Sequence, residues 1–420
     1  MWGITVYDFA FDYRSLKREL LPSDFAKEPQ LVDEAVKEAV LASSQALAST
    51  GFNNLVLQRS LLRGKPVYQV VPTDQNLVLR KFSRNIRRLT RVKQSDRDTI
   101  IKSLRALFQE GHNFRVYKLD IRNFYESIDR DFVGDLLKRD NGLPPTTLYV
   151  YQSFSSSLAG LNISGLPRGL AVSAVLSEYA MRQFDRSIKS YECVYYYARY
   201  VDDVIVVTTG RENKKDFKKY LIDSLPSGLQ LNYSKTRVSD FTRPKVNTVN
   251  QQTSEGKIDF LGYQFNIFGQ LRMPDRSFAR KVLVDISENK KKRFQTRITL
   301  SALQFRKDGN FNDLYDRVRV LSGNYNVYDM DRKIRRNVGI LYNYRFVDVD
   351  NSDHLIQMDR FIKALFLSNT GKLSASFAAM SKIQRRKILS LSFQRSFRTG
   401  EFHHFEISRL SDLVRCWAYE

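Results

Sequence analysis

The sequence predicts an α+β fold. Helix-like and strand-like segments alternate along its 420 residues without the regular strand–helix–strand rhythm of a doubly wound parallel sheet. In three places two strand-like segments are separated by only a few residues, which is typical of antiparallel hairpins. Hydrophobic residues make up 42% of the chain, enough for a large core, and the length favours two or three subdomains.

The first part of the chain is expected to be mostly helical. Residues 25–50 have the apolar spacing of an amphipathic helix, and residues 77–92 continue the helical pattern. Between them, residues 53–71 indicate the first hairpin. Residues 95–111 begin with a capping box and end at a glycine, so they predict a further helix.

The middle of the chain carries the other strand signals. Residues 114–121 predict a strand, and residues 165–184 predict a loop that leads into a helix. Residues 197–207 indicate the second hairpin, and residues 257–273 indicate the third, with its turn at Gly269. From about residue 275 onwards the pattern is mostly helical and basic.

The chain is strongly basic. Its 68 Lys and Arg residues exceed its 45 Asp and Glu residues by 23, which favours a polyanionic partner. No run of about 18 apolar residues occurs, and the N-terminus lacks the pattern of a signal peptide. Cys193 and Cys416 have no metal-binding spacing and fit a reduced, cytoplasmic location. Nucleic acid is therefore the expected partner rather than a membrane, and a merely well-solvated basic protein is the alternative.

Two adjacent aspartates interrupt the apolar segment YARYVDDVIVV. If Asp202 and Asp203 lie on the tight turn of a hairpin, their carboxylates stand at the edge of a sheet. Asp120 ends another expected strand, and all three carboxylates converge if the two strands are neighbours. Clustered carboxylates suit Mg²⁺, which prefers oxygen ligands. Two such ions about 4 Å apart stabilise the attacking and leaving oxygens of a phosphoryl transfer. The alternative is a surface turn with two solvated aspartates, because Asp is common in turns.

Five segments in order resemble the motifs of reverse transcriptases. They are LDIRNFYESI, GLPRGLAVS, YVDD, LNYSKT and FLGY, and they fall within residues 114–268. The resemblance implies a right-hand polymerase with fingers, a palm and a thumb. It places an N-terminal extension and fingers at residues 1–113, the palm with part of the fingers at 114–268, and a helical, basic thumb at 269–420.

The same resemblance implies the catalytic residues. Asp120, Asp202 and Asp203 match the triad that holds two Mg²⁺ ions, which Mn²⁺ can replace, and the backbone carbonyl of Ile121 assists one ion. Lys235 matches the lysine that protonates the leaving pyrophosphate, with a solvated loop lysine as the alternative.

Tyr125 matches the aromatic gate that lies under the incoming sugar and rejects a 2′-hydroxyl, so the resemblance implies synthesis of DNA from dNTPs. The alternative is a core aromatic beside Phe124. Viral RNA-copying polymerases are the close competitor, but they typically carry Gly before the paired aspartates, where this chain has Val201.

Basic residues complete the expected substrate site. Four arginines precede the palm motifs, and of these Arg88 and Arg97 are favoured as triphosphate ligands because the guanidinium fork suits phosphate oxygens. Arg168 stands where the family commonly has Gln, and Ala174 stands where a Pro usually follows the Ser. Arg168 is expected to touch the nucleotide or the template backbone, and these two departures leave the mode of base-pair sensing open.

The sequence on either side of these motifs resembles the defence-associated, anti-phage group of bacterial reverse transcriptases. RRLTRVKQSDRDTIIKSLRALF and RVRVLSGNYNVYD carry this likeness, with the smaller catalytic subunit of the type-three two-polymerase systems as the specific match. It implies a non-coding RNA as template and scaffold, a DNA product, a second reverse transcriptase subunit and an oligomeric ribonucleoprotein.

Three other functions remain open from the sequence: a retron-type enzyme, a protein-primed untemplated polymerase of the abortive-infection kind, and a non-catalytic RNA-binding scaffold. The intact carboxylate triad argues against the scaffold.

Overall fold

The computed structural model describes residues 8–140, 142–241, 254–272, 278–368, 370–371 and 374–418. Contacts within the chain define two compact units. The first comprises residues 1–96 and 113–240, and the second comprises residues 97–112 and 241–420. The functional regions expected from the motifs follow a different division, and their boundaries stay a prediction.

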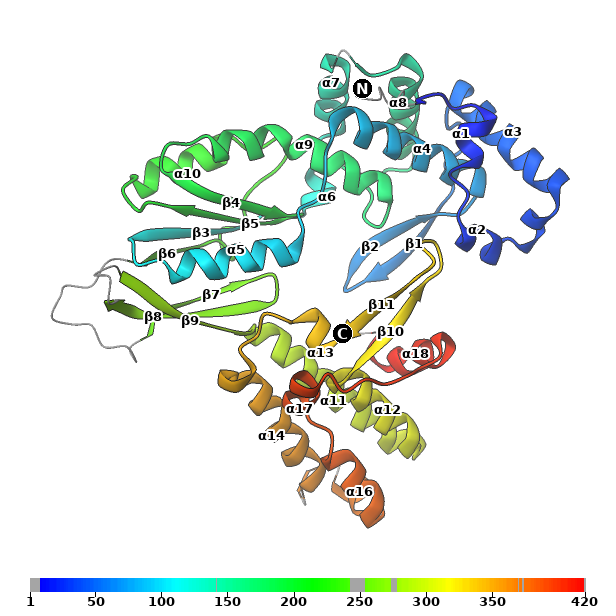
Figure 1. The fold of residues 1–420 in the computed structure, drawn as a ribbon. Coiled ribbons are helices and arrows are strands. Elements are labelled where there is room, and N and C mark those ends of the chain that lie inside the picture. Colours follow the sequence, from blue (N-terminus) through cyan, green and yellow to red (C-terminus); the bar gives the residue numbers. More distant parts are fainter. Residues whose placement is uncertain are drawn as a thin grey trace, which may run out of the picture. The chain divides into compact units, whose positions relative to one another are not determined.

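The first unit combines helices with a hairpin and a four-stranded sheet (Figure 1). The predicted hairpin near residue 60 is confirmed, because β1 pairs with β2 in antiparallel register. The helices before the sheet are α1 (Tyr13–Lys17), α2 (Pro22–Lys27), α3 (Glu34–Thr50) and α4 (Thr73–Thr90), and the hairpin strands are β1 (Leu57–Leu62) and β2 (Lys65–Val70).

The four-stranded sheet has the order β4-β5-β3-β6, and β5 pairs antiparallel with both β4 and β3. Its strands are β3 (Phe114–Asp120), β4 (Val194–Tyr200), β5 (Asp203–Thr208) and β6 (Arg237–Phe241). The segments between them form α6 (Phe124–Ser127), α7 (Arg130–Arg139), α8 (Pro145–Gly160), α9 (Ala171–Lys189) and α10 (Lys214–Asp223).

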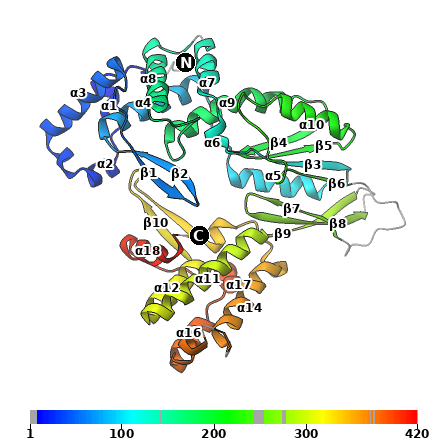
Figure 2. The ribbon, with the colours of Figure 1, turned by 180° about the vertical axis from the view of Figure 1, so that it is seen from behind.

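Helices α9 and α10 cover one face of this sheet, as the front and back views both show (Figures 1 and 2). Tyr117 and Tyr197 are both paired with Val206, so cross-strand neighbours place their rings on the same face. Tyr117 contacts Phe217 of α10, and Tyr197 contacts Phe184 of α9. This packing fixes the strands whose ends carry the aspartates.

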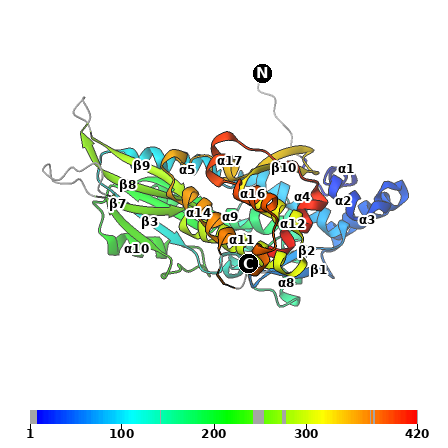
Figure 3. The ribbon, with the colours of Figure 1, turned by 90° about the horizontal axis from the view of Figure 1, so that it is seen from below.

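The second unit contains a three-stranded sheet, a hairpin and a group of helices, seen from below in Figure 3. Its strands are β7 (Ser254–Phe260), β8 (Tyr263–Arg272), β9 (Phe278–Ile286), β10 (Asn324–Asp329) and β11 (Ile334–Gly339). Its helices are α5 (Arg97–Gln109), α11 (Glu288–Asp308), α12 (Phe311–Ser322), α13 (Ile340–Asn343), α14 (Asp353–Leu367), α15 (Ser374–Ala378), α16 (Lys382–Leu389), α17 (Phe393–Thr399) and α18 (Ile407–Val414).

The mixture of helices with antiparallel sheets confirms the predicted α+β class. The expected turn at Gly269 is wrong, because the β7–β8 turn lies at Leu261 and Gly262 and Gly269 lies inside β8. Both turn residues have positive φ, as a type I′ hairpin requires, and Gly262 supplies that conformation without strain. Within the part of the chain that is described, no helix is long and apolar enough to cross a membrane.

Candidate active site

Asp120 and Asp203 are paired residues of neighbouring strands. β3 ends at Asp120, β5 begins at Asp203, and the antiparallel register places the two opposite each other. The two-residue turn between β4 and β5 consists of Val201 and Asp202, because Tyr200 pairs with Asp203. The predicted neighbourhood of the two strands is therefore confirmed, and all three aspartates lie at one end of the sheet.

The turn before the paired aspartates is strained. Val201 has φ of 60°, in the left-handed region that a β-branched residue rarely adopts, at a cost of about 1–3 kcal/mol. Asp202 is not among the residues with positive φ, so the turn has the φ signs of type II′, which usually requires Gly at its first central position. The other two-residue turns among the described hairpins, at 63–64 and 261–262, have positive φ at both residues.

The carboxylates at this end repel each other in a partly buried setting. Burial is the main cause that raises the pKa of Asp203 to about 6, and the charges of Asp202 and Asp120 raise it further. Burial, together with the charge of Asp120, also raises the pKa of Asp202. Nearby lysines oppose these shifts only in part. A protein that keeps such groups together gains from a cation that offsets their charge.

The donor set fits a hard divalent cation. Three carboxylates supply only oxygen ligands, which Mg²⁺ prefers. Burial, and after it the charges of Asp202 and Asp120, raise the pKa of Asp203, while Lys118 and Lys235 lower it. Within the described residues, no group of three or more His, Cys, Asp or Glu side chains forms a ready-made metal site.

The segment before β6 lies along the end of β3. The amide of Asn232 donates to the Asp120 carbonyl at 2.7 Å, and the amide of Arg122 donates to the Gln230 carbonyl at 2.9 Å. These two bonds frame the bridge between Ile121 and Leu231 and do not use the carbonyl of Ile121.

Lys235 follows in the same segment. Its Nζ lies 3.4 Å from Oδ1 of Asp120, and its side chain is 65% exposed. The structure thus brings Lys235 together with the aspartates.

Tyr125 lies on the short helix α6, which follows β3 directly. Burial is the main cause that raises its pKa, and the charge of Asp202 contributes, so the phenol lies within electrostatic range of the turn. Its ring contacts Phe124, and its backbone carbonyl accepts a hydrogen bond from the amide of Leu166 at 2.8 Å. The predicted gate residue therefore lies beside the loop predicted to support the nucleotide.

Arg168 joins this loop to Tyr125. Its guanidinium lies 5.4 Å from the centre of the Tyr125 ring and forms an ion pair with Glu126 at 3.2 Å. Although burial of Glu126 opposes it, the hydrogen bond from Arg168 lowers the pKa of that carboxyl. The carbonyl of Arg168 accepts from the amide of Tyr68 in β2. A Cβ on Gly169 would clash with that strand at 2.7 Å, so only glycine permits this close approach.

Residues 69–265 match the family model described as reverse transcriptase (RNA-dependent DNA polymerase). The matched segment, a little under half of the chain, is similar to a reverse transcriptase domain. It contains the three aspartates, Tyr125, Arg168 and Lys235. Comparison with curated protein sequences found no match.

Two solved structures of telomerase from Candida tropicalis resemble the chain. The apo form truncated from its C-terminal domain has 14% sequence identity and a TM-score of 0.34, and the match covers 51% of this chain and 53% of that one. The complex with the TWJ fragment of telomeric RNA has 13% identity and a TM-score of 0.34, and the match covers 51% and 44%. The chain thus matches about half the length of these telomerases.

The two favoured arginines lie on helices α4 and α5. Arg88 is an exposed residue in the last turn of α4, within electrostatic range of Glu19. Arg97 begins α5 in the second unit, where it donates to the carbonyls of Leu261 and Asn343 at 2.9 and 2.8 Å. Its guanidinium also lies 4.8 Å from the ring centre of Tyr263. A role on the triphosphate stays a prediction for both arginines.

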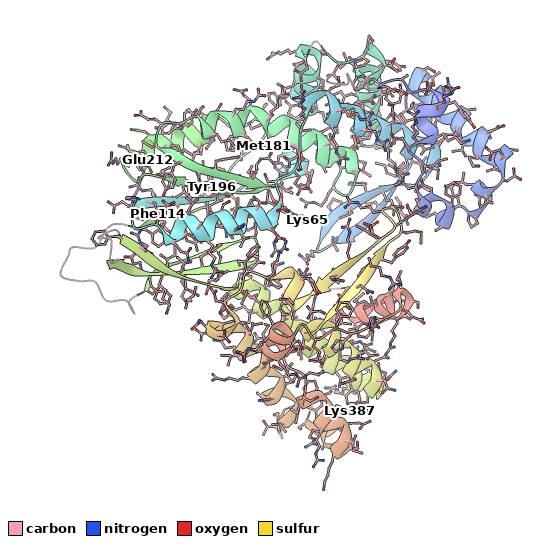
Figure 4. The ribbon with its side chains drawn as sticks, viewed as in Figure 1. Lys65, Phe114, Met181, Tyr196, Glu212 and Lys387 are labelled. Atoms are coloured by element: carbon pink, nitrogen blue, oxygen red, sulfur yellow. The ribbon has the colours of Figure 1, made fainter. Side chains whose placement is uncertain are left out.

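Sequence reasoning missed several charged residues near the candidate site. Glu126 pairs with Arg168, and Lys65, at the start of β2, lies within electrostatic range of Asp202 and Glu126. Figure 4 shows Lys65 beyond the end of β3 opposite to Phe114. Arg199 was also missed, although a charged residue inside the aromatic and apolar strand YYYARY is itself a signal.

Proposed function

We propose that the protein is a reverse transcriptase that makes DNA from dNTPs at Asp120, Asp202 and Asp203. The pairing of Asp120 with Asp203 next to the Asp202 turn is the observation that carries this proposal. Two Mg²⁺ ions, or Mn²⁺ in their place, would supply the charge that stabilises the attacking and leaving oxygens. The three carboxylates and the carbonyl of Ile121 would hold them.

The surrounding side chains have separate roles in this proposal. Tyr125 limits the space under the sugar, and the Glu126–Arg168 pair keeps its ring in place. Lys235, which lies at the rim beside Asp120, donates a proton to the leaving pyrophosphate. Arg88, Arg97 and Arg168 contribute positive charge toward the triphosphate or the template.

The finer biological role extends this proposal. The excess of 23 positive charges supports a polyanionic partner, and a non-coding RNA is proposed as template and scaffold. The likeness to the defence-associated group supports an anti-phage role in the cytoplasm beside a second reverse transcriptase subunit. In this proposal the fingers, palm and thumb occupy residues 1–113, 114–268 and 269–420.

Asp202→Asn tests the chemistry. The variant should fold and bind RNA as the unaltered protein does, and incorporate dNTPs at least about a thousandfold more slowly, because it loses a charged metal ligand. Primer extension with purified protein, with urea unfolding as the folding control, measures both. Near-normal extension by Asp202→Asn would remove the basis of the proposal.

Sequencing the nucleic acid that co-purifies at low salt tests the RNA. A single structured RNA supports the proposal, and binding should weaken steeply as salt rises. RNA joined covalently to DNA would instead indicate a retron-type enzyme, and DNA on a tyrosine would indicate protein priming. Protein that is free of nucleic acid at low salt would contradict a stable ribonucleoprotein.

A further inference from the structure

Arg199 lies buried in β4, two residues before the strained Val201, with only 3% of its side chain exposed. Its Nη2 lies 2.7 Å from Oε2 of Glu178, and its Nε lies 2.8 Å from Oδ1 of Asp185. Its Nη1 donates to the carbonyl of Val201 at 3.1 Å. One guanidinium therefore connects helix α9 to the turn that carries Asp202.

Both acidic partners come from α9, seven residues apart, so they lie on one face of the helix two turns apart. Each binds the guanidinium with both carboxylate oxygens: Glu178 accepts from Nη1 and Nη2, and Asp185 accepts from Nε and Nη2. The hydroxyl of Tyr197 donates to Asp185 at 2.6 Å. The arginine is thus held from two sides, and its bond to Val201 comes from a fixed donor.

The Val201 carbonyl is the group that decides the turn type. Type I′ and type II′ turns share positive φ at the first central residue and differ by a flip of the central peptide. In this hairpin the central peptide joins Val201 to Asp202, and its oxygen is the atom that Arg199 binds. The hairpin turns at 63–64 and 261–262 have the φ signs of type I′, and the turn at Val201 has those of type II′.

We infer that Arg199 is a positioning residue for catalysis. Clamped by Glu178 and Asp185, it holds the central peptide of the turn and keeps Asp202 at negative φ, which sets the direction of the Asp202 carboxylate relative to Asp120 and Asp203. This inference rests on the proposed function, in which these carboxylates act in phosphoryl transfer. A lysine at this position would offer three N–H donors on a single nitrogen, so it cannot reproduce the five hydrogen bonds that the guanidinium makes.

Arg199→Lys is the first test, and Arg115→Lys is its matched control. Arg115 is also a buried arginine of this sheet with two acidic partners, Glu212 and Asp240, but it lies at the far end of β3. Arg199→Lys should lower kcat for dNTP incorporation about tenfold to a hundredfold, with a smaller change in KM, because the reacting groups are misplaced. Arg115→Lys should lower stability and leave kcat unchanged.

Urea unfolding identifies the conditions in which both variants are folded. Steady-state extension under those conditions then gives kcat and KM. If Arg199→Lys retains kcat as well as Arg115→Lys does, the positioning role is wrong and the arginine is structural. Should Arg199→Lys not fold, Glu178→Gln provides the same comparison, since it loosens the clamp and keeps the shape of the side chain.

A double-mutant cycle with Val201→Gly tests the turn itself. Glycine adopts positive φ without strain, so the turn should depend less on the hydrogen bond from Arg199 to the carbonyl of residue 201. Arg199→Lys should therefore reduce kcat less in the Val201→Gly background than in the unaltered protein, and equal reductions would contradict the inference.

Asp202→Asn separates the two proposals. If that variant stays active the proposed function fails, whereas if it is inactive and Arg199→Lys is not impaired only the positioning role fails.

Discussion

The two ends of the β3–β5 strand pair differ in how their buried carboxylates are compensated by positively charged partners. At one end Arg115 pairs with Thr208 in the strand register, and at the other end Asp120 pairs with Asp203. Figure 4 shows Phe114 and Glu212 together at the first end and Lys65 beyond the second. On each strand only four residues separate these two pairs, so the same two strands connect the compensated Glu212 to the group of three aspartates.

At the compensated end Glu212, through its Oε1, and Asp240 both have strong partners. Glu212 accepts from Arg115, Tyr117 and Thr208 at 2.7–2.8 Å. Although burial opposes it, these hydrogen bonds lower the pKa of Glu212. Asp240 is bound by Arg115 and Lys214, which likewise lower its pKa against the effect of burial.

At the aspartate end the balance is reversed. Burial and neighbouring carboxylates raise the pKa of both Asp202 and Asp203, and Lys235 lies 3.4 Å from Asp120. The only arginine bound to the turn, among the contacts of the described residues, is Arg199, and it holds a backbone carbonyl rather than a carboxylate. The difference teaches that this sheet can neutralise buried acids, so the partly buried carboxylates without such partners at the other end mark a place for cations.

The largest effect should come from Asp203→Asn. Primer extension with dNTPs should fall at least about a thousandfold, because a proposed ligand of the catalytic ions is lost. The free energy of unfolding should stay the same or rise, because the substitution removes repulsion with Asp202 and Asp120. Urea titration in EDTA beside an extension assay measures both. A marked loss of stability would show that Asp203 is a structural acid like Glu212.

Glu212→Gln should show the opposite behaviour. The free energy of unfolding should fall by about 2–3 kcal/mol, because a buried arginine loses one of its charged partners. Extension per folded molecule should not change. Urea unfolding and an extension assay at a temperature where the variant is folded make the comparison, and loss of kcat in the folded variant would break it.

A smaller effect concerns the sugar. Tyr125→Val should raise the ratio of rNTP to dNTP incorporation about tenfold, because it opens space within reach of Asp202 without removing a charged group. Phe124→Leu is the matched control, since that neighbouring ring is buried and should affect stability alone. Single-nucleotide extension on one primer gives the ratio. An unchanged ratio for Tyr125→Val would identify the ring as part of the core.

The smallest effect is a pH dependence. Because the pKa of Glu212 in the folded protein lies below its ordinary value of 4.5, its ionised form stabilises the fold. That contribution is fully present above pH 4.5 and is lost as the pH falls through the lowered pKa. The difference in unfolding free energy between the unaltered protein and Glu212→Gln should therefore shrink on acidification below pH 4.5. If this difference in unfolding free energy does not change with pH, the hydrogen bonds of Glu212 and not its charge stabilise this end of the strand pair.

The sequence by itself determined the α+β class, the order of the motifs and the three aspartates. These features depend on local patterns: apolar strands of a few residues, a two-residue turn and acidic residues at strand ends. The misplaced Gly269 turn shows the limit, since Leu261 and Gly262 supply the turn and Gly269 falls within a register shift of β8. A glycine signals either a turn or a bulge, and only strand pairing distinguishes them.

The tertiary structure alone decided which charges meet. Arg168 pairs with Glu126 across 42 positions, and Arg199 pairs with Glu178 across 21. Arg97, expected on the triphosphate, binds the carbonyl of Leu261, 164 positions away. Such pairs form because packing of α9 on the sheet, and of loops on strands, brings distant side chains within about 3 Å. No local periodicity encodes that distance, so the acids that hold Arg199, and with it the turn at Val201, were visible only in the folded chain.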